Sequence, residues 1–287
     1  MAENTKPLIS KEEIIETANL RKLHLTWLAN PLMGILGVHA INKFYAAIPP
    51  EPAGYLFLVT AMKNHQISYP IAEDDLQNIP KEGAFITVSN HPFGFLDGIL
   101  LILAIGKVRP DIKVMANYWL KRMLPIQDFF LAVDPYESAQ QTAKSLAGTR
   151  LTLQHLKDGH PVGIFPAGEI STYQKGKGLS VSSQTTVAAE IQDRAWQIPV
   201  IKVIKKAKVP IVPVHFEGQN SFWFHLLGRI NPALRTPKII SEFMNKRGKT
   251  IPIRIGAPIS LEKQNEFENL EDYASFLRNE TYALPER

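Results

Sequence analysis

Short apolar runs alternate with longer segments of helical spacing along most of this chain. The runs, which are typical of buried strands, occupy residues 84–89, 112–116, 162–165, 210–216 and 251–255. Apolar residues recur at helical spacing in residues 97–106, 137–158, 199–207 and 269–280. This alternation predicts an α/β fold, with a mixed, largely parallel central sheet flanked by helices.

The first part of the chain has a different pattern. Ser10 and Glu13 have the spacing of a capping box, which predicts the start of a helix of about 18 residues. A break follows at residues 46–56, where prolines and a glycine cluster. We therefore expect a helical N-terminal segment over residues 1–55, followed by the α/β domain over residues 56–287.

An apolar stretch at residues 25–41 is the best candidate for contact with a membrane. It contains Asn30, Pro31 and His39 and is shorter than the roughly 20 apolar residues of a membrane-spanning helix, so we expect no crossing. Basic residues on both sides and Trp27 suit a helix that lies in the membrane interface. The alternative is an ordinary packing helix that breaks near Pro31.

The composition narrows the function further. Hydrophobic residues make up 45% and charged residues 21% of the 287 residues, which excludes collagen, coiled coils and wholesale disorder. The absence of cysteine excludes disulfides, thiolate metal ligands and a cysteine nucleophile. A formal net charge of +5 fits an anionic partner such as anionic lipid, an acidic carrier protein or nucleic acid, although it is equally compatible with an ordinary soluble protein. The N-terminal residues lack the pattern of a signal peptide, so we expect none.

The loop after the first strand carries the first candidate for chemistry. His91 stands at the strand end, and the Pro and Gly that follow allow a turn that brings Asp97 back beneath the imidazole. A carboxylate on one ring nitrogen fixes the tautomer and leaves the other nitrogen free to accept a proton, as in a general base. The alternative is a turn histidine beside an aspartate that caps the next helix.

A second candidate loop follows the strand at residues 162–165. Its Pro166-Ala167-Gly168 turn would expose backbone N–H groups, which suit an anion or a developing oxyanion; the alternative is a plain turn. Ligands of such sheets gather at the carboxyl ends of the strands. We therefore expect both loops to face the same cleft.

Both loops resemble motifs of one family, the glycerolipid (lysophospholipid and glycerol-3-phosphate) acyltransferases. The Asn-His-Pro-Phe-Gly run from Asn90 to Gly94, with Asp97 after it, resembles motif I. The same run of residues is similar to that of the hemolysin-like or aminolipid O-acyltransferase branch. The family usually has four residues between His and Asp, whereas five separate His91 from Asp97. In total the resemblance covers about residues 70–260.

The second loop resembles motif III of the family, Phe-Pro-Glu-Gly-Thr-Arg-Ser. Four positions match: Phe165, Pro166, Gly168 and Ser171. The Glu of the motif falls on Ala167, and its Arg, which is associated with the acceptor phosphate in glycerol-phosphate enzymes, falls on Ile170. This loss argues for an acceptor other than glycerol phosphate, and Glu169 is a candidate for the missing carboxylate.

Several other residues are weaker candidates. Lys175 and Lys177 either meet a phosphate or an acidic carrier, or belong to a solvated loop. The strand near residue 213 resembles motif IV, and we interpret His215 within it as structural. The aromatic-rich residues 118–130 and 221–230 either pack in the core or face lipid. Motif II of the family has no clear counterpart in the sequence, and Lys121, Arg122 and Asp134 are candidates only.

The resemblance implies an enzyme, an O-acyltransferase of phospholipid or aminolipid biosynthesis. A fatty acyl thioester, acyl-ACP or acyl-CoA, is the expected donor, and the hydroxyl of a lyso-lipid is the acceptor, with an aminolipid such as a lyso-ornithine or lyso-glycine lipid favoured. His91 is the expected general base, Asp97 orients it, and backbone donors around Gly168 hold the oxyanion. The expected substrate-binding residues are Asn90, Phe93, Gly94, Phe165, Pro166, Ala167, Gly168, Glu169 and Ser171.

The remaining expectations concern partners and place. We expect no metal and no cofactor besides the donor, and the partners are acyl carrier protein or a coenzyme A thioester, the lyso-lipid, and the membrane surface, without nucleic acid. The expected location is cytoplasmic, peripheral on the inner face of the cell membrane. Two alternatives stay open: an acyl-thioester hydrolase, in which water replaces the lipid acceptor, and a non-catalytic basic lipid-binding protein.

Overall fold

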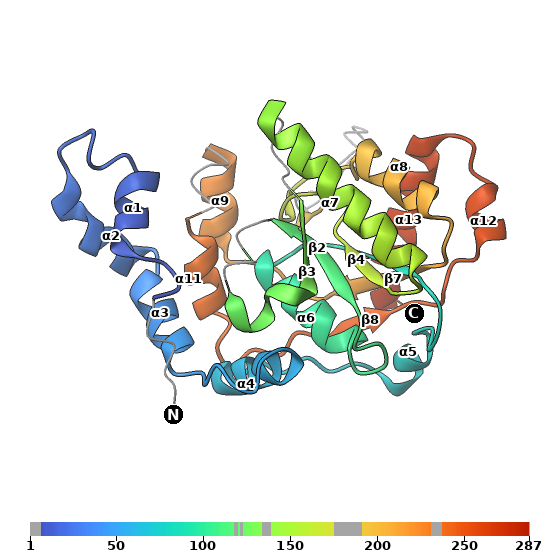
Figure 1. Cartoon of the computed structure of the whole chain (residues 1–287), viewed down its shortest axis with the longest axis horizontal. Helices are drawn as coiled ribbons and strands as arrows, with labels where there is room; N and C mark the ends of the chain where they lie inside the picture. Colours follow the sequence, from blue (N-terminus) through green and yellow to red (C-terminus); the bar gives the residue numbers. More distant parts are fainter. Residues whose placement is uncertain are drawn as a thin grey trace, which may run out of the picture. The chain divides into compact units, whose positions relative to one another are not determined.

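A six-stranded sheet with the order β3-β2-β4-β1-β7-β8 forms the centre of the computed structural model (Figure 1). The structure describes residues 7–117, 120, 123–133, 139–174, 191–230 and 237–286. The strands are β1 (Ile86–Ser89), β2 (Lys113–Asn117), β3 (Phe130–Val133), β4 (Val162–Ile164), β7 (Ile211–Phe216) and β8 (Ile253–Ile255). All neighbours pair in parallel except β7 and β8, which are antiparallel. The predicted α/β fold with a mixed, largely parallel sheet is confirmed.

The strands that the sequence did not predict are short or lie among aromatic residues. Strand β3 was hidden in an aromatic-rich segment whose pattern did not distinguish a strand from core packing. Strands β5 (Thr172–Tyr173) and β6 (Ile191–Gln192) form a separate antiparallel pair. Each has two residues, too few to give a periodic signal.

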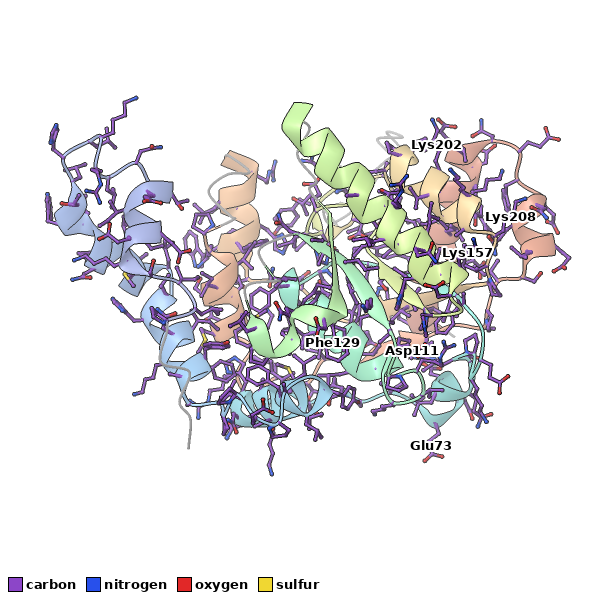
Figure 2. The ribbon with its side chains drawn as sticks, viewed as in Figure 1. Glu73, Asp111, Phe129, Lys157, Lys202 and Lys208 are labelled. Atoms are coloured by element: carbon purple, nitrogen blue, oxygen red, sulfur yellow. The ribbon has the colours of Figure 1, made fainter. Side chains whose placement is uncertain are left out.

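Helices cover both faces of the sheet. One face packs on α8 (Ile198–Ala207) and α13 (Leu270–Tyr282), whose Ile201, Ile204 and Leu277 join the buried core with Val88. The outer side of α8 carries lysines such as Lys202, which point away from the sheet (Figure 2). This division between an apolar and a basic side explains why α8 forms and how it docks.

The opposite face packs on α6 (Phe95–Ile105), which is apolar on all sides and almost entirely buried. Gly163 of β4 permits this close packing, because a Cβ there would lie 2.5 Å from a methyl group of Leu101. The long helix α7 (Ala139–Lys157) packs against β3 and β4 on the same face as α8, because its Leu156 belongs to the same buried core as Ile201. It ends before Gly159, whose φ of 92° allows the reversal into β4.

The chain divides into two compact units. The first contains Met1–Ser68, Lys121–Gln127 and Ser221–Thr250, and the second contains the sheet with the rest of the chain. Among the described residues, the α-helices that lie wholly in the first unit are α1 (Lys11–Thr17), α2 (Ala29–Ile35), α3 (Val38–Ala46), α4 (Tyr55–His65), α9 (Phe222–Ile230) and α11 (Ile239–Met244). The boundary predicted at residue 55 stays a prediction.

The first helix starts as predicted but is much shorter. The capping box is present: the Glu13 N–H donates to Ser10 Oγ at 3.2 Å, and the Ser10 N–H donates to the Glu13 carboxylate at 2.7 Å. The expected length of about 18 residues is wrong, because α1 ends at Thr17. Asn19 and His24 take left-handed backbone angles, with φ of 52° and 56°, and these end the helical path.

The apolar stretch at residues 25–41 contains α2 and the start of α3. The break lies at Gly37, with φ of 76°, and not near Pro31, which a helix tolerates in the first turn of α2. Trp27 is 70% exposed and Ile35 is 76% exposed. Among the helices of the described ranges, none has the length and apolarity that a membrane crossing requires.

Helix α9 shows that the second aromatic-rich segment is partly buried and partly exposed. Phe224 is fully buried, whereas Phe222 and Trp223 are exposed. The start of α9 is held by the buried Glu242 of α11, whose carboxylate accepts from the Ser221 N–H at 2.8 Å and from Ser221 Oγ at 2.6 Å.

Candidate active site

The carboxyl end of β1 is fixed to β7 by a buried asparagine. Asn90 donates through Nδ2 to the Phe216 carbonyl at 3.0 Å and accepts from the Phe216 N–H at 2.8 Å. These bonds continue the pairing of the strands beyond Ser89, where the ladder of β1 ends. Asn90 thereby sets the backbone position from which His91 projects.

His91 and Asp97 meet directly. His91 Nδ1 lies 2.9 Å from Asp97 Oδ2; the imidazole is 19% exposed, and the carboxylate is completely buried. The same Oδ2 accepts the backbone N–H groups of Phe93 and Gly94, each at 2.9 Å. Asp97 therefore lies in the first turn of α6, where it caps the helix start at Gly94 and faces the imidazole at once.

The electrostatics of Asp97 depend on His91. Burial raises the pKa of the Asp97 carboxyl, whereas the adjacent imidazole and the N–H groups of Phe93 and Gly94 lower it. Among the described residues Asp97 Oδ1 has no hydrogen-bond partner.

The second loop packs against the imidazole. The rings of His91 and Phe165 lie 4.5 Å apart at 31°, and the Ser171 N–H donates to the His91 carbonyl at 2.9 Å. The two loops expected to face one cleft are therefore in contact. Pro166 and Ala167 are buried behind the turn.

The backbone N–H of Gly168 itself is used within the turn, so the expected oxyanion donors around Gly168 would be its neighbours. Its N–H donates to the Phe165 carbonyl at 3.0 Å, so it is occupied within the turn. Glycine is favoured at this position because its φ of 68° lies in the left-handed region, and because a Cβ here would collide with the Gln197 side chain. Gln197 braces the turn by donating through Nε2 to the Ala167 carbonyl at 2.9 Å.

Glu169 and Ile170, the positions where the loop departs from motif III, have opposite surroundings. Glu169 lies near the surface with its carboxylate 3.2 Å from Arg194, whereas Ile170 is buried. The other charged candidates lie outside the described residues: Lys121, Arg122, Asp134, Lys175 and Lys177.

Asp193 is a site residue that the sequence analysis missed. It is 1% exposed, and its Oδ1 accepts from the His91 N–H at 3.1 Å and from Ser171 Oγ at 2.6 Å. Its Oδ2 accepts from Trp196 Nε1 at 3.2 Å. Burial raises the pKa of Asp193, while Ser171 and His91 lower it. No local pattern marks this aspartate, which follows the short strand β6.

A pocket of about 630 Å³ adjoins these loops. Its polar wall comes from Ser171, Gln192, His215, Arg278, Asn279 and Tyr282. Burial, together with nearby Arg254, lowers the pKa of His215 to about 4, so this imidazole is neutral near pH 7. Within the described ranges no three His, Asp or Glu side chains are grouped so that they could hold a metal ion.

Comparison with known proteins agrees with the motifs. A family model described as an acyltransferase matches residues 17–287. Two curated relatives, each a lyso-glycine lipid O-acyltransferase, come from Phocaeicola vulgatus and Bacteroides thetaiotaomicron. Each is 26% identical over 216 residues, which is 73% of this chain and 71% and 73% of theirs, respectively.

A solved structure, the 1-acyl-sn-glycerophosphate acyltransferase of Thermotoga maritima, is also similar. It has 15% identity and a TM-score of 0.49, covering 94% of this chain and 92% of that one. The family match alone spans most of the chain. This protein therefore belongs to this acyltransferase family, and it is an enzyme.

Proposed function

We propose that this enzyme moves a fatty acyl group from an acyl thioester, acyl-ACP or acyl-CoA, to the hydroxyl of a lyso-lipid. The observation that carries the proposal is the 2.9 Å contact between His91 Nδ1 and Asp97 Oδ2 at the carboxyl end of β1. This is the arrangement of a general base with its orienting carboxylate.

The proton transfer needs only these two side chains and the substrates. With Nδ1 facing Asp97, His91 Nε2 accepts the proton of the acceptor hydroxyl as its oxygen attacks the thioester carbonyl. A C–O bond forms, the C–S bond breaks, and the leaving thiolate takes the proton from the imidazolium. The Asp97 carboxylate balances the transient charge, and no covalent enzyme intermediate is required because the thioester is already activated. Backbone donors around Gly168, other than its own N–H, hold the oxyanion.

The acceptor that we favour is an aminolipid of the lyso-glycine type. Both curated relatives carry that substrate in their names. In this chain the buried Ile170 occupies the position of the phosphate-associated Arg of motif III. A buried aliphatic side chain offers no charge to a phosphate.

We further propose that the enzyme works at the inner surface of the cell membrane, as a cytoplasmic peripheral protein. Support comes from the exposed Trp27 and Ile35 of the first unit, with basic residues nearby in the sequence. An aromatic and an aliphatic side chain beside cations suit the headgroup region of a bilayer.

The test is acyl transfer by purified protein with a defined thioester and a lyso-glycine lipid in mixed micelles. His91→Ala should lower kcat by about 100- to 10,000-fold, the usual contribution of a general base. His160→Ala, a histidine just before the amino end of β4, is the matched control and should keep full turnover. Normal turnover by His91→Ala contradicts the mechanism, and fatty acid released without acylated lipid points to the hydrolase.

A further inference from the structure

The polar pocket and the His91 imidazole lie on opposite faces of one sheet edge. His91 points to the α6 side, where Asp97 lies. Side chains alternate along a strand, so Asn90 points to the other side, and it lines the pocket together with Tyr282 of α13. The proposed proton transfer does not use this pocket.

Two buried polar atoms at this pocket have no hydrogen-bond partner within the described part of the chain: Arg278 Nε and His215 Nδ1. The Arg278 guanidinium lies over the Tyr282 ring, 4.5 Å from its centroid. Its Nη2 donates to Gln192 Oε1 at 2.7 Å and to the Asp193 carbonyl at 3.0 Å. Both atoms are closed off from solvent, but Arg278 as a whole is half-buried and lines the pocket. Its Nη1 makes no hydrogen bond with the described residues, so this nitrogen is the one that a ligand oxygen can reach.

The charge of the wall selects the kind of ligand. Arg278 is the cation of the described lining, and the lining includes no Asp or Glu. His215, with its lowered pKa, and Tyr282, with its raised pKa, are neutral near pH 7. A single guanidinium matches a singly charged carboxylate, to which its Nη1 can donate a charge-assisted hydrogen bond. The side-chain amides of Gln192 and Asn279 offer partners for an amide group next to that carboxylate.

We propose that Arg278 and the surrounding pocket bind the head-group carboxylate of the acceptor, an N-acylated amino acid, and thereby select it over phosphate-headed lyso-lipids. This inference rests on the proposed function and specifies its acceptor. A phosphate monoester carries up to two charges and has no amide beside them, so it matches this wall less well.

A short connection relates the pocket to the catalytic loop. The Asp193 carbonyl accepts from Arg278, and the Asp193 carboxylate accepts from the His91 N–H. Asp193 therefore links the guanidinium that holds the head group to the loop that carries the base. Its acyl hydroxyl extends over the sheet edge toward the imidazole.

The test compares substrates before it compares variants. Wild-type enzyme is assayed with a lyso-glycine lipid, with its glycinamide analogue, in which a neutral amide replaces the carboxylate, and with lysophosphatidic acid. We expect the glycinamide to raise KM by about 10- to 100-fold with little change in kcat, the usual effect of losing a hydrogen bond to a charged group. This comparison does not depend on the folding of any variant.

Variants then assign the effect to Arg278. Arg278→Gln should raise KM for the carboxylate acceptor by a similar factor and should no longer distinguish it from the glycinamide. Arg278→Lys should recover part of the discrimination. Arg150→Gln, on the exposed side of α7, is the matched control and should behave as wild type.

The outcomes separate this inference from the proposed function. Equal KM values of the wild-type enzyme for the carboxylate and glycinamide acceptors would overturn the pocket assignment while acyl transfer stands. Preference for lysophosphatidic acid, or full discrimination by Arg278→Gln, would overturn it as well. Absence of transfer to every acceptor overturns the proposed function, and the inference falls with it.

Discussion

Asp193 Oδ1 accepts the backbone N–H of His91 at 3.1 Å, although the two residues are 102 positions apart in the sequence. The same oxygen accepts from Ser171 Oγ at 2.6 Å. One buried carboxylate thus connects the loop after β1 with the loop after β4. The position of the imidazole depends on this connection as well as on Asp97.

Removing the Asp193 carboxylate should misplace the base. Asp193→Ala leaves the His91 N–H, the Ser171 hydroxyl and the Trp196 N–H without their buried acceptor, so we expect kcat to fall at least about 10-fold. The cost in unfolding free energy should be about 2–5 kcal/mol. Asp193→Asn, which retains an acceptor oxygen, should recover part of both. Steady-state kinetics measure kcat and urea unfolding measures the free energy of unfolding, with Asp158→Asn at an exposed position as the control. Full activity of Asp193→Ala would refute a positioning role.

Replacing Asp97 with Asn should separate catalysis from stability. The amide oxygen still accepts from Phe93 and Gly94, but the charge that orients and balances His91 is lost, so kcat should fall by about 100-fold or more. Because burial raises the pKa of Asp97 in the folded state, the native protein binds a proton more tightly than the unfolded chain. Wild-type stability therefore falls as pH rises through that raised pKa.

Asp97→Asn lacks this dependence, so its Tm should equal or exceed that of wild type at pH 7 to 8. The two proteins should converge toward acid pH. Calorimetry across this range is the measurement. A variant that melts well below wild type at neutral pH would mean that the ion pair with His91 outweighs the cost of burying the carboxylate.

His215 should make the fold sensitive to acid. Its pKa of about 4 in the folded protein lies below the ordinary value, so the unfolded chain takes up a proton that the native protein does not. Stability should fall by about 3 kcal/mol as pH decreases from about 6.5 to about 4 and should not change further through this group below that. Arg254 and the Tyr282 ring, which face the imidazole, stay in place in His215→Gln.

His215→Gln should flatten this part of the pH profile in chemical denaturation. The exposed His39→Gln serves as the control and should keep the wild-type slope. An unchanged slope in His215→Gln would show that other groups cause the acid sensitivity.

Gly168→Ala should destabilise the loop after β4. Alanine would have to adopt the left-handed backbone of Gly168, and its Cβ would collide with the Gln197 amide. We therefore expect the free energy of unfolding to fall by about 1–3 kcal/mol and the activity to decrease. Gly34→Ala in α2 meets no atom within 4 Å and should be neutral or slightly stabilising. Combining Gly168→Ala with Gln197→Ala should relieve the side-chain contact but not the backbone strain, and full recovery in thermal unfolding would contradict this division.

The sequence alone determined the parts of this protein that depend on near neighbours. The apolar runs of β1, β2, β4, β7 and β8 were visible because a buried strand must be apolar along its length. The pair of His91 and Asp97 was visible for a similar reason, since only a turn containing Pro and Gly separates them. Local spacing was sufficient to predict that the two side chains meet.

Only the tertiary structure decided which distant residues join them. Asp193 and Arg278 reach the site from elements far along the chain, and neither has a periodic or motif signal. The tertiary structure also placed His215, interpreted from the sequence as structural, in the wall of the pocket. It further showed that the Gly168 N–H donates to the Phe165 carbonyl within the same turn. A hydrogen bond between distant residues depends on how strands and helices pack, and packing is a property of the whole chain that no local pattern encodes.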